Sequence, residues 1–259
     1  MPCAGLDVGS LWTKAVVMQD GKIAGWGIAP TGDSNTAAAE QTLKQSLAAG
    51  GLSMDDLSLI IVTGAGNNDV RFQVRQANEV LCVAKGIRYA NPATRGVVDI
   101  GAESTRIVKL DEAGNVADYV INDKCASGTG VFLDAMAKVM GVAVEDMGAL
   151  SLESTAEVDI TSTCVVFAES EVVSQVHRQT PKKDILKGIH KSIATRVFGM
   201  INRMDLDGEN MVIGGLSLNV GIVSCLEEMM KKKLIVPENP RITSALGAAL
   251  IATEQGGKK

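Results

Sequence analysis

The sequence is poor in aromatic residues, which make up 3% of its 259 residues, and it has only two histidines. It also lacks an excess of basic residues, because 25 lysines and arginines face 30 aspartates and glutamates, for a net charge of −5. Nucleic acids and anionic membranes require a basic surface, so neither is expected as a partner. No apolar run approaches the ~20 residues of a transmembrane helix, and no signal-peptide pattern is present. We therefore expect a protein of the cytoplasm.

Cysteine is scarce as well, with five residues far apart in the sequence, at positions 3, 82, 125, 164 and 225. An odd number of widely spaced cysteines in an intracellular chain argues against a disulfide framework. Any cysteine with a special role is then a metal ligand or a reactive thiol. Apolar residues (46%) and charged residues (21%) are present in ordinary globular proportion. A folded chain with an aliphatic core is expected.

One pattern of predicted elements occurs twice along the chain. Three strands and a helix are predicted first at Ala4–Val8, Thr13–Met18, Lys22–Ile28 and Thr36–Ala49. The same order returns at Gly96–Ile100, Thr105–Leu110, Asn115–Ile121 and Asp123–Met140. The repeat predicts an α/β fold of two similar βββαβα lobes, residues 1–94 and 95–242, with a cleft between them. A C-terminal helix at about 243–259 is expected to pack back on the first lobe.

Each copy begins with a strand that ends in Asp-x-Gly, as Asp7-Val8-Gly9 and Asp99-Ile100-Gly101. Glycine lets a ligand approach the backbone, and the N–H groups of such a turn can bind phosphate oxygens. A carboxylate beside phosphate is favourable when Mg²⁺ lies between them. The alternative is that each motif merely ends a strand in a turn. Two copies in matched contexts favour the phosphate site.

A third glycine turn, Gly214-Gly215-Leu216, follows a predicted strand and precedes a predicted helix. The order of these turns, with an Ala/Gly-rich helix near the end, resembles the actin–hexokinase–Hsp70 ATPase superfamily. The resemblance implies ATP or ADP with Mg²⁺ between the lobes, with adenine at the third turn and Asp7 and Asp99 as catalytic carboxylates. Lys14 is also consistent with a strand residue facing solvent. The residues expected to contact the nucleotide are Gly9, Ser10, Leu11, Trp12, Thr13, Lys14, Gly101, Ala102, Gly214, Gly215 and Leu216.

Two of the cysteines are predicted at helix N-termini. Cys125 lies at the start of the second predicted helix and is followed by small residues, and Cys164 follows Ser and Thr and precedes an apolar-periodic stretch. At a helix N-terminus the macrodipole and the free N–H groups favour a thiolate. Two cysteines cannot hold a [4Fe–4S] cluster, which takes four thiolates, but two copies of the chain around a twofold axis can. The alternative is that both are buried structural thiols. The other three cysteines are expected to be structural.

The segments Asn122–Gly130 and Ser162–Glu171, which contain these cysteines, are similar to those of a known family. They resemble the activator component of 2-hydroxyacyl-CoA dehydratases and the ATPase subunits of ATP-dependent benzoyl-CoA reductases, and the resemblance runs end to end. It implies a homodimer, or a heterodimer with a paralogous subunit, bridged by one [4Fe–4S] cluster on Cys125 and Cys164 of each subunit. It also implies a reduced ferredoxin or flavodoxin as donor, and an iron–sulfur dehydratase or reductase as acceptor.

One motif departs from the dehydratase activators, since Gly101-Ala102-Glu103 stands where they usually carry Gly-Gly-Gln. This variant is closer to the benzoyl-CoA reductase ATPases, so the acceptor stays open. Glu103 becomes a candidate catalytic residue that positions the attacking water, with a plain surface residue as the alternative. Two other functions compete with electron transfer, a small-molecule kinase of the same superfamily and a nucleotide-binding regulator. The kinase has no reason to place thiols at two helix N-termini, and in the regulator the cysteines would be structural.

Overall fold

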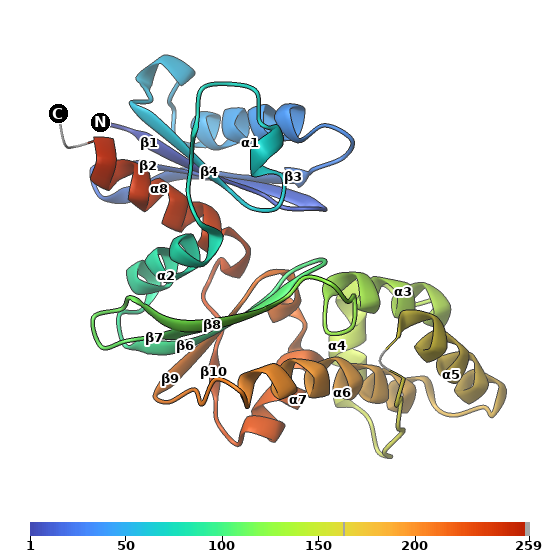
Figure 1. Ribbon diagram of the computed structural model, residues 1–259. Coiled ribbons are helices and arrows are strands. Elements are labelled where there is room, and N and C mark those ends of the chain that lie inside the picture. Colours follow the sequence, from blue (N-terminus) through green and yellow to red (C-terminus); the bar gives the residue numbers. More distant parts are fainter. Residues whose placement is uncertain (163, 257–259) are drawn as a thin grey trace. The chain divides into compact units, whose positions relative to one another are not determined.

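The computed structural model describes residues 1–162 and 164–256, which form two compact units (Figure 1). Unit 1 consists of the described residues within 1–94, 110–117 and 241–259, and unit 2 of those within 95–109 and 118–240. Within these described stretches, no helix is long and apolar enough to cross a membrane.

Unit 1 is built on a five-stranded mixed sheet with the order β3-β2-β1-β4-β5. Its strands are β1 (Cys3–Val8), β2 (Trp12–Gln19), β3 (Lys22–Pro30), β4 (Leu59–Thr63) and β5 (Arg75–Gln76). The first three are antiparallel neighbours, and β4 is parallel to both β1 and β5. Asp20 and Gly21 between β2 and β3 both have positive φ, as a type I′ hairpin turn requires.

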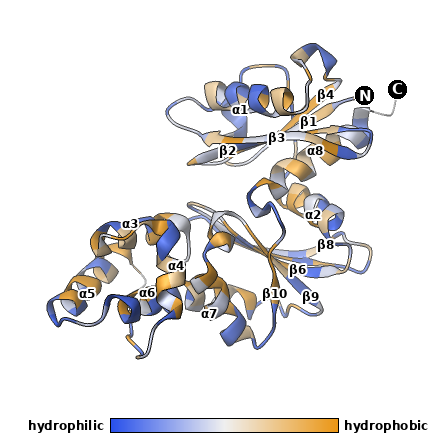
Figure 2. Cartoon of the chain, turned by 180° about the vertical axis from the view of Figure 1, so that it is seen from behind, coloured by the Kyte–Doolittle hydropathy of each residue, from blue (hydrophilic) through white to orange (hydrophobic). Residues whose placement is uncertain are grey.

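Helices cover both faces of this sheet. The helix α1 (Asn35–Ala49) buries Ala39, Leu43 and Leu47 against one face, and Figure 2 shows hydrophobic and hydrophilic residues alternating along it. The helix α8 (Thr243–Gly256) covers the other face and packs against α2 (Glu79–Ala90). An added Cβ at Gly5 of β1 would overlap the backbone of Ala245, so small residues allow this close contact.

Unit 2 repeats the strand order of unit 1, as β10-β9-β6-β7-β8. These strands are β6 (Thr94–Ile100), β7 (Thr105–Leu110), β8 (Val116–Asn122), β9 (Glu209–Ile213) and β10 (Leu234–Ile235). Its helices are α3 (Gly130–Met140), α4 (Val144–Leu152), α5 (Val165–His177), α6 (Lys182–Ile201) and α7 (Val220–Met230). The predicted repetition of strands is therefore present in the structure.

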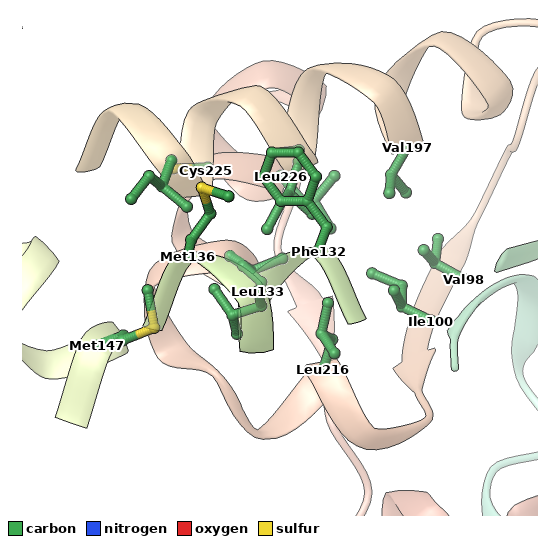
Figure 3. Packing of buried hydrophobic residues seen from close by; sticks show 14 of the residues in the cluster. Val98, Ile100, Phe132, Leu133, Met136, Met147, Val197, Leu216, Cys225 and Leu226 are labelled. Carbon is green, nitrogen blue, oxygen red and sulfur yellow. The ribbon is translucent and has the colours of Figure 1, made fainter. Parts of the chain in front are cut away.

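The core of unit 2 forms around one face of α3 (Figure 3). Phe132, Leu133 and Met136 are at most 1% exposed and pack with Val197 of α6 and Leu226 of α7. Full burial of side chains of this size contributes roughly 1.5–3 kcal/mol each. The core thus fixes the start of α3, which lies next to the cysteine segment.

The helix predicted over Asp123–Met140 is shorter than expected, because α3 begins only at Gly130. Gly128 has a φ of +83°, outside the helical region. The Asn122 side chain donates to the carbonyls of Cys125 and Ser127, so these groups are engaged outside a helix. Residues 123–129 form a loop, and the prediction of a helix there was wrong.

His190 of α6 is fully buried, and neither ring nitrogen has a hydrogen-bond partner among the described residues. Burial, and secondly the charge of Lys187, lowers the pKa of His190 to about 4, from 6.5. The unfolded chain therefore binds this proton more tightly than the folded chain. The contribution of His190 to the free energy of unfolding is complete above pH 6.5, where the imidazole is neutral in both states. It falls as the pH drops towards 4, by about 3 kcal/mol in total, because the unfolded chain is protonated first.

We expect the free energy of unfolding in urea to fall by about 2 kcal/mol between pH 7 and pH 5 through this residue. His190→Leu should remove that part of the pH dependence, because a leucine of similar size carries no titrating group. His177→Gln, at the exposed end of α5, is the matched control and should leave it in place. Equal pH dependence in the wild type and His190→Leu would contradict the assignment.

Candidate functional site

The two aspartates predicted to be catalytic occupy equivalent positions in the two units. Asp7 is the penultimate residue of β1 and Asp99 that of β6, and both are buried. Asp7 Oδ2 lies 3.0 Å from Lys14 Nζ, and Asp99 Oδ2 lies 2.9 Å from Arg106 Nη1. In each case the cation comes from the residue opposite on the neighbouring antiparallel strand. Lys14 is therefore held by a carboxylate and does not face solvent.

A glycine closes over each carboxylate. Gly64 follows β4 and Gly214 follows β9, with φ of +93° and +86°. A Cβ added to Gly64 would lie 2.5 Å from Asp7 Oδ1, and one added to Gly214 would lie 2.7 Å from Asp99 Oδ1. Each unit thus supplies two turns, an Asp-x-Gly turn and a second glycine turn beside it.

The Asp-x-Gly turns are tightened by backbone hydrogen bonds. Gly9 N–H donates to the Trp12 carbonyl over 3.1 Å, and Gly101 N–H donates to the Ser104 carbonyl over 2.8 Å. The predicted phosphate-binding residues Ser10, Leu11 and Trp12 are exposed, whereas Thr13 is buried and Gly9, Gly101 and Ala102 are partly buried. Ser10, Leu11 and Trp12 are therefore accessible to a ligand.

Glu103 is exposed and forms no hydrogen bond or ion pair with the other described residues. The third predicted turn has the expected order of strand, turn and helix, since a short 3₁₀ helix (Gly215–Leu218) leads from β9 into α7. Gly214 and Gly215 are at its start, but the Leu216 side chain packs into the unit 2 core. Only the backbone of Leu216 can then face a ligand.

In each unit, the aspartate of the Asp-x-Gly turn is a suitable ligand for Mg²⁺ bound mainly through a nucleotide. Carboxylate oxygen is a ligand that Mg²⁺ prefers. In the described part of the chain, no three His, Cys, Asp or Glu residues come together as a metal-binding group. Mg²⁺ is usually held by about one or two carboxylates together with phosphates and water, so a complete protein cage is not required.

The two candidate cluster ligands lie in unit 2, and both are accessible. Cys164 is exposed and is the N-cap residue of α5, as predicted. Cys125 is partly buried in the loop before α3, five residues ahead of its first helical residue, so its predicted place at a helix N-terminus was wrong. Because α3 and α5 pack against each other, the two cysteines precede the two helices of one packed pair.

The chain entering α5 is held by Glu171. One carboxylate oxygen accepts the N–H groups of Thr161 (2.7 Å) and Ser162 (3.3 Å), and the other accepts their hydroxyls (2.9 and 2.6 Å). Burial raises the pKa of the Glu171 carboxyl, but the hydrogen bonds from Ser162 and Thr161 outweigh it and leave that pKa below its ordinary value. The segment before Cys164 is thus fixed to the helix that follows it.

The other three cysteines, Cys3, Cys82 and Cys225, are buried and free. Burial raises the pKa of Cys82 to about 12 and also raises that of Cys225. Cys125 and Cys164 are therefore the accessible thiols of the described chain, two of the four that a [4Fe–4S] cluster takes. This donor set fits a cluster shared between two chains.

Comparison with known proteins decides the family. Residues 4–252 match the BadF/BadG/BcrA/BcrD ATPase family. The chain belongs to this ATPase family. It is 37% identical over 251 residues to the 2-hydroxyisocaproyl-CoA dehydratase activator of Clostridioides difficile, covering 97% of this chain and 94% of that protein. It is 38% identical over 256 residues to the activator of lactoyl-CoA dehydratase of Anaerotignum propionicum, covering 98% of each.

Solved structures agree with this membership. The activator of the 2-hydroxyisocaproyl-CoA dehydratase from Clostridium difficile with bound ADPNP superposes with a TM-score of 0.95 at 37% identity, covering 100% of this chain and 96% of that one. A glucokinase from Streptomyces griseus gives a TM-score of 0.60 at 12% identity, covering 98% and 100%, and shows the fold alone. The resemblance and the ATPase fold class predicted from the sequence are both confirmed.

Several residues of this BadF/BadG/BcrA/BcrD ATPase were missed in the sequence, among them Gly64, Arg106, Asn122 and Glu171. A signal existed for Gly64, because a glycine directly follows the fourth strand of each repeat. Arg106 follows Asp99 at the same spacing at which Lys14 follows Asp7. Asn122 and Glu171 form hydrogen bonds with the backbone of loops, and those loops have no sequence pattern of their own.

Proposed function

We propose that this chain is an activator ATPase that drives one electron from a [4Fe–4S] cluster, shared by two chains, to an iron–sulfur CoA-thioester dehydratase or benzoyl-CoA reductase. Reduced ferredoxin or flavodoxin supplies the electron, the acceptor takes it, and ATP and water become ADP and phosphate. The observation that carries the proposal is the accessible pair Cys125 and Cys164 in a member of this ATPase family. The relatives named as dehydratase activators support it.

The residues of the two Asp-x-Gly turns bind the phosphates, and Asp7 and Asp99 orient Mg²⁺. Lys14 and Arg106 hold these carboxylates in place, so that their charge is positioned before the nucleotide arrives. The backbone of Gly214, Gly215 and Leu216 accommodates adenine. Glu103, exposed and unpaired among the described residues, positions the attacking water. These roles follow the usual division of phosphoryl transfer into positioning and charge stabilisation.

Cys125 and Cys164 supply two thiolates, and a second chain supplies two more. When bound, the cluster supplies a one-electron redox couple at low potential. Cys164 at the N-terminus of α5 is placed where the helix macrodipole stabilises its negative charge. Next to it, Val166 and Phe167 are 66% and 65% exposed, and Figure 2 shows this hydrophobic colouring on α5. Exposed apolar residues of this size favour an interface with a second protein chain.

Oxygen sensitivity tests the proposal. Protein purified without air should be brown, contain iron and acid-labile sulfide, and hydrolyse ATP. Because an electron must leave the site quickly, the site is accessible, and air should bleach the colour irreversibly within minutes to hours. Visible absorbance and iron content, followed before and after air exposure, measure this. Colourless protein with full ATPase activity would contradict electron transfer and would support a kinase or a regulator.

A further inference from the structure

The turn at residues 101–104, here called the phosphate turn, is bonded directly to the start of α3. Gly130 N–H donates to the Gly101 carbonyl and Val131 N–H to the Ala102 carbonyl, both over 2.9 Å. The first N–H groups of a helix have no acceptor within the helix, so these carbonyls satisfy them. The phosphate turn is therefore part of the N-terminal cap of the helix that follows Cys125.

A side chain makes a second connection. Thr105, the first residue of β7, is fully buried, and its hydroxyl donates to the Gly128 carbonyl over 2.7 Å. Gly128 belongs to residues 123–129, here called the Cys125 loop, and is itself buried. A buried carbonyl that loses its donor costs free energy, because water cannot replace the partner. Two hydrogen bonds thus join the phosphate turn to the start of α3, and a third, buried one joins Thr105, the residue after the turn, to the Cys125 loop.

The start of α3 is tightly packed at this junction. A Cβ added to Gly130 would lie 3.2 Å from Ala102 Cα and 3.0 Å from Leu216 Cδ1. The start of α3 therefore contacts both the phosphate turn and the turn proposed to hold adenine. Packed groups of this kind shift together rather than independently.

Unit 1 offers an internal comparison. Thr13 is the equivalent of Thr105, since each directly precedes the cation that pairs with the aspartate. The Thr13 hydroxyl instead bonds to the Thr31 hydroxyl at 2.9 Å, and the first helix of that unit begins at Asn35 with Ser34 as its cap. The link to a helix start is present in the unit that carries the cysteines.

We propose that Thr105 is a positioning residue that couples the phosphate turn to the Cys125 loop, so that binding or hydrolysis of ATP at the turn displaces the peptide that carries Cys125. The inference rests on the proposed function for its two ends, the nucleotide and the cluster. The three hydrogen bonds are the physical connection between those ends. Such coupling is reciprocal, and couplings of this type are about fivefold or larger.

Amide hydrogen exchange of the full chain, kept without air, tests this coupling. The exchange of residues 122–131 is compared with and without ADP and ADPNP. In the wild type, nucleotide should change that exchange about fivefold or more. Thr105→Val removes the hydroxyl at constant shape and should abolish the nucleotide response at this segment, whereas Thr105→Ser should retain it. Thr42→Val in α1 is the matched control, because the buried Thr42 hydroxyl also donates to a carbonyl, that of Ala38, over 2.7 Å.

A second variant and a second readout complete the experiment. Val131→Pro removes the N–H that reaches Ala102, in the first helical turn where proline is tolerated, and should weaken the same response. The rate at which a chelator extracts iron should depend on nucleotide in the wild type and not in Thr105→Val. An unchanged nucleotide response in Thr105→Val, or none in the wild type, would overturn the coupling. Failure of the wild type to bind nucleotide or iron, measured by calorimetry and iron analysis, would instead overturn the proposed function.

Discussion

ATP hydrolysis should fall by on the order of 100-fold when Asp7 or Asp99 is replaced by Asn, because a positioned charge at the transferring phosphate is lost. Asparagine keeps the size of the side chain but cannot orient Mg²⁺ as a carboxylate does. Each substitution also removes the carboxylate charge that pairs with a largely buried cation, Lys14 or Arg106. Loss of one member of a buried ion pair costs about 3 kcal/mol or more, so thermal stability should fall as well.

Steady-state phosphate release measures the activity, and circular dichroism checks that the variants are folded at the assay temperature. Asp118→Asn on the exposed face of β8 is the control and should keep full activity. The doubly neutral variant Asp99→Asn/Arg106→Met also removes the buried positive charge, so it should recover stability while remaining inactive. Full hydrolysis by folded Asp7→Asn and Asp99→Asn proteins would remove both residues from the proposed catalytic site.

Local patterns were sufficient for most strands. The strand predicted at Thr105–Leu110 has the same bounds in the structure, and the other predicted strands of the repeat differ by at most two residues at each end. Short apolar runs bounded by turn residues set most of these elements, and both are properties of neighbouring residues. The pairing of β4 with β1 is different, since it joins segments far apart in the chain. That pairing brings Gly64 to Asp7, which no local pattern indicates.

The contacts of Lys14 and the form of the Cys125 loop also depend on pairing between separate segments of the chain. A strand pattern alone left open whether Lys14 faces solvent or phosphate, and the register opposite Asp7 decides that it pairs with the carboxylate. The Cys125 loop was predicted as helix because the helical spacing of Phe132, Leu133 and Met136 was extended back over it, although its glycine disfavours a helix. Its form is set by Asn122 and by Thr105, which donate hydrogen bonds to different carbonyls of the loop. The sequence therefore could not predict the hydrogen bonds and ion pairs that side chains form with other strands and loops.

Changing Cys125 or Cys164 to Ser should remove the cluster and weaken the dimer together. If each chain gives two thiolates to one cluster, iron should be four atoms per dimer, because a [4Fe–4S] cluster takes four thiolates. Binding energy for a shared ligand is also assembly energy, so loss of the ligand lowers the affinity between chains. We expect iron to drop to about a tenth of the wild-type content or less, since loss of a direct ligand exceeds the ~10–100-fold effect of losing its supporting contacts.

Iron and acid-labile sulfide counts, together with sedimentation of anaerobic protein, measure both effects at once. Cys3→Ala, Cys82→Ala and Cys225→Ala are the controls and should keep the iron, because these thiols are buried away from any partner chain. All five variants should still bind ADP, since the nucleotide turns belong to other segments. A Cys125→Ser protein that retains its iron, or a count of four iron atoms per chain in the wild type, would contradict a cluster shared through these two cysteines.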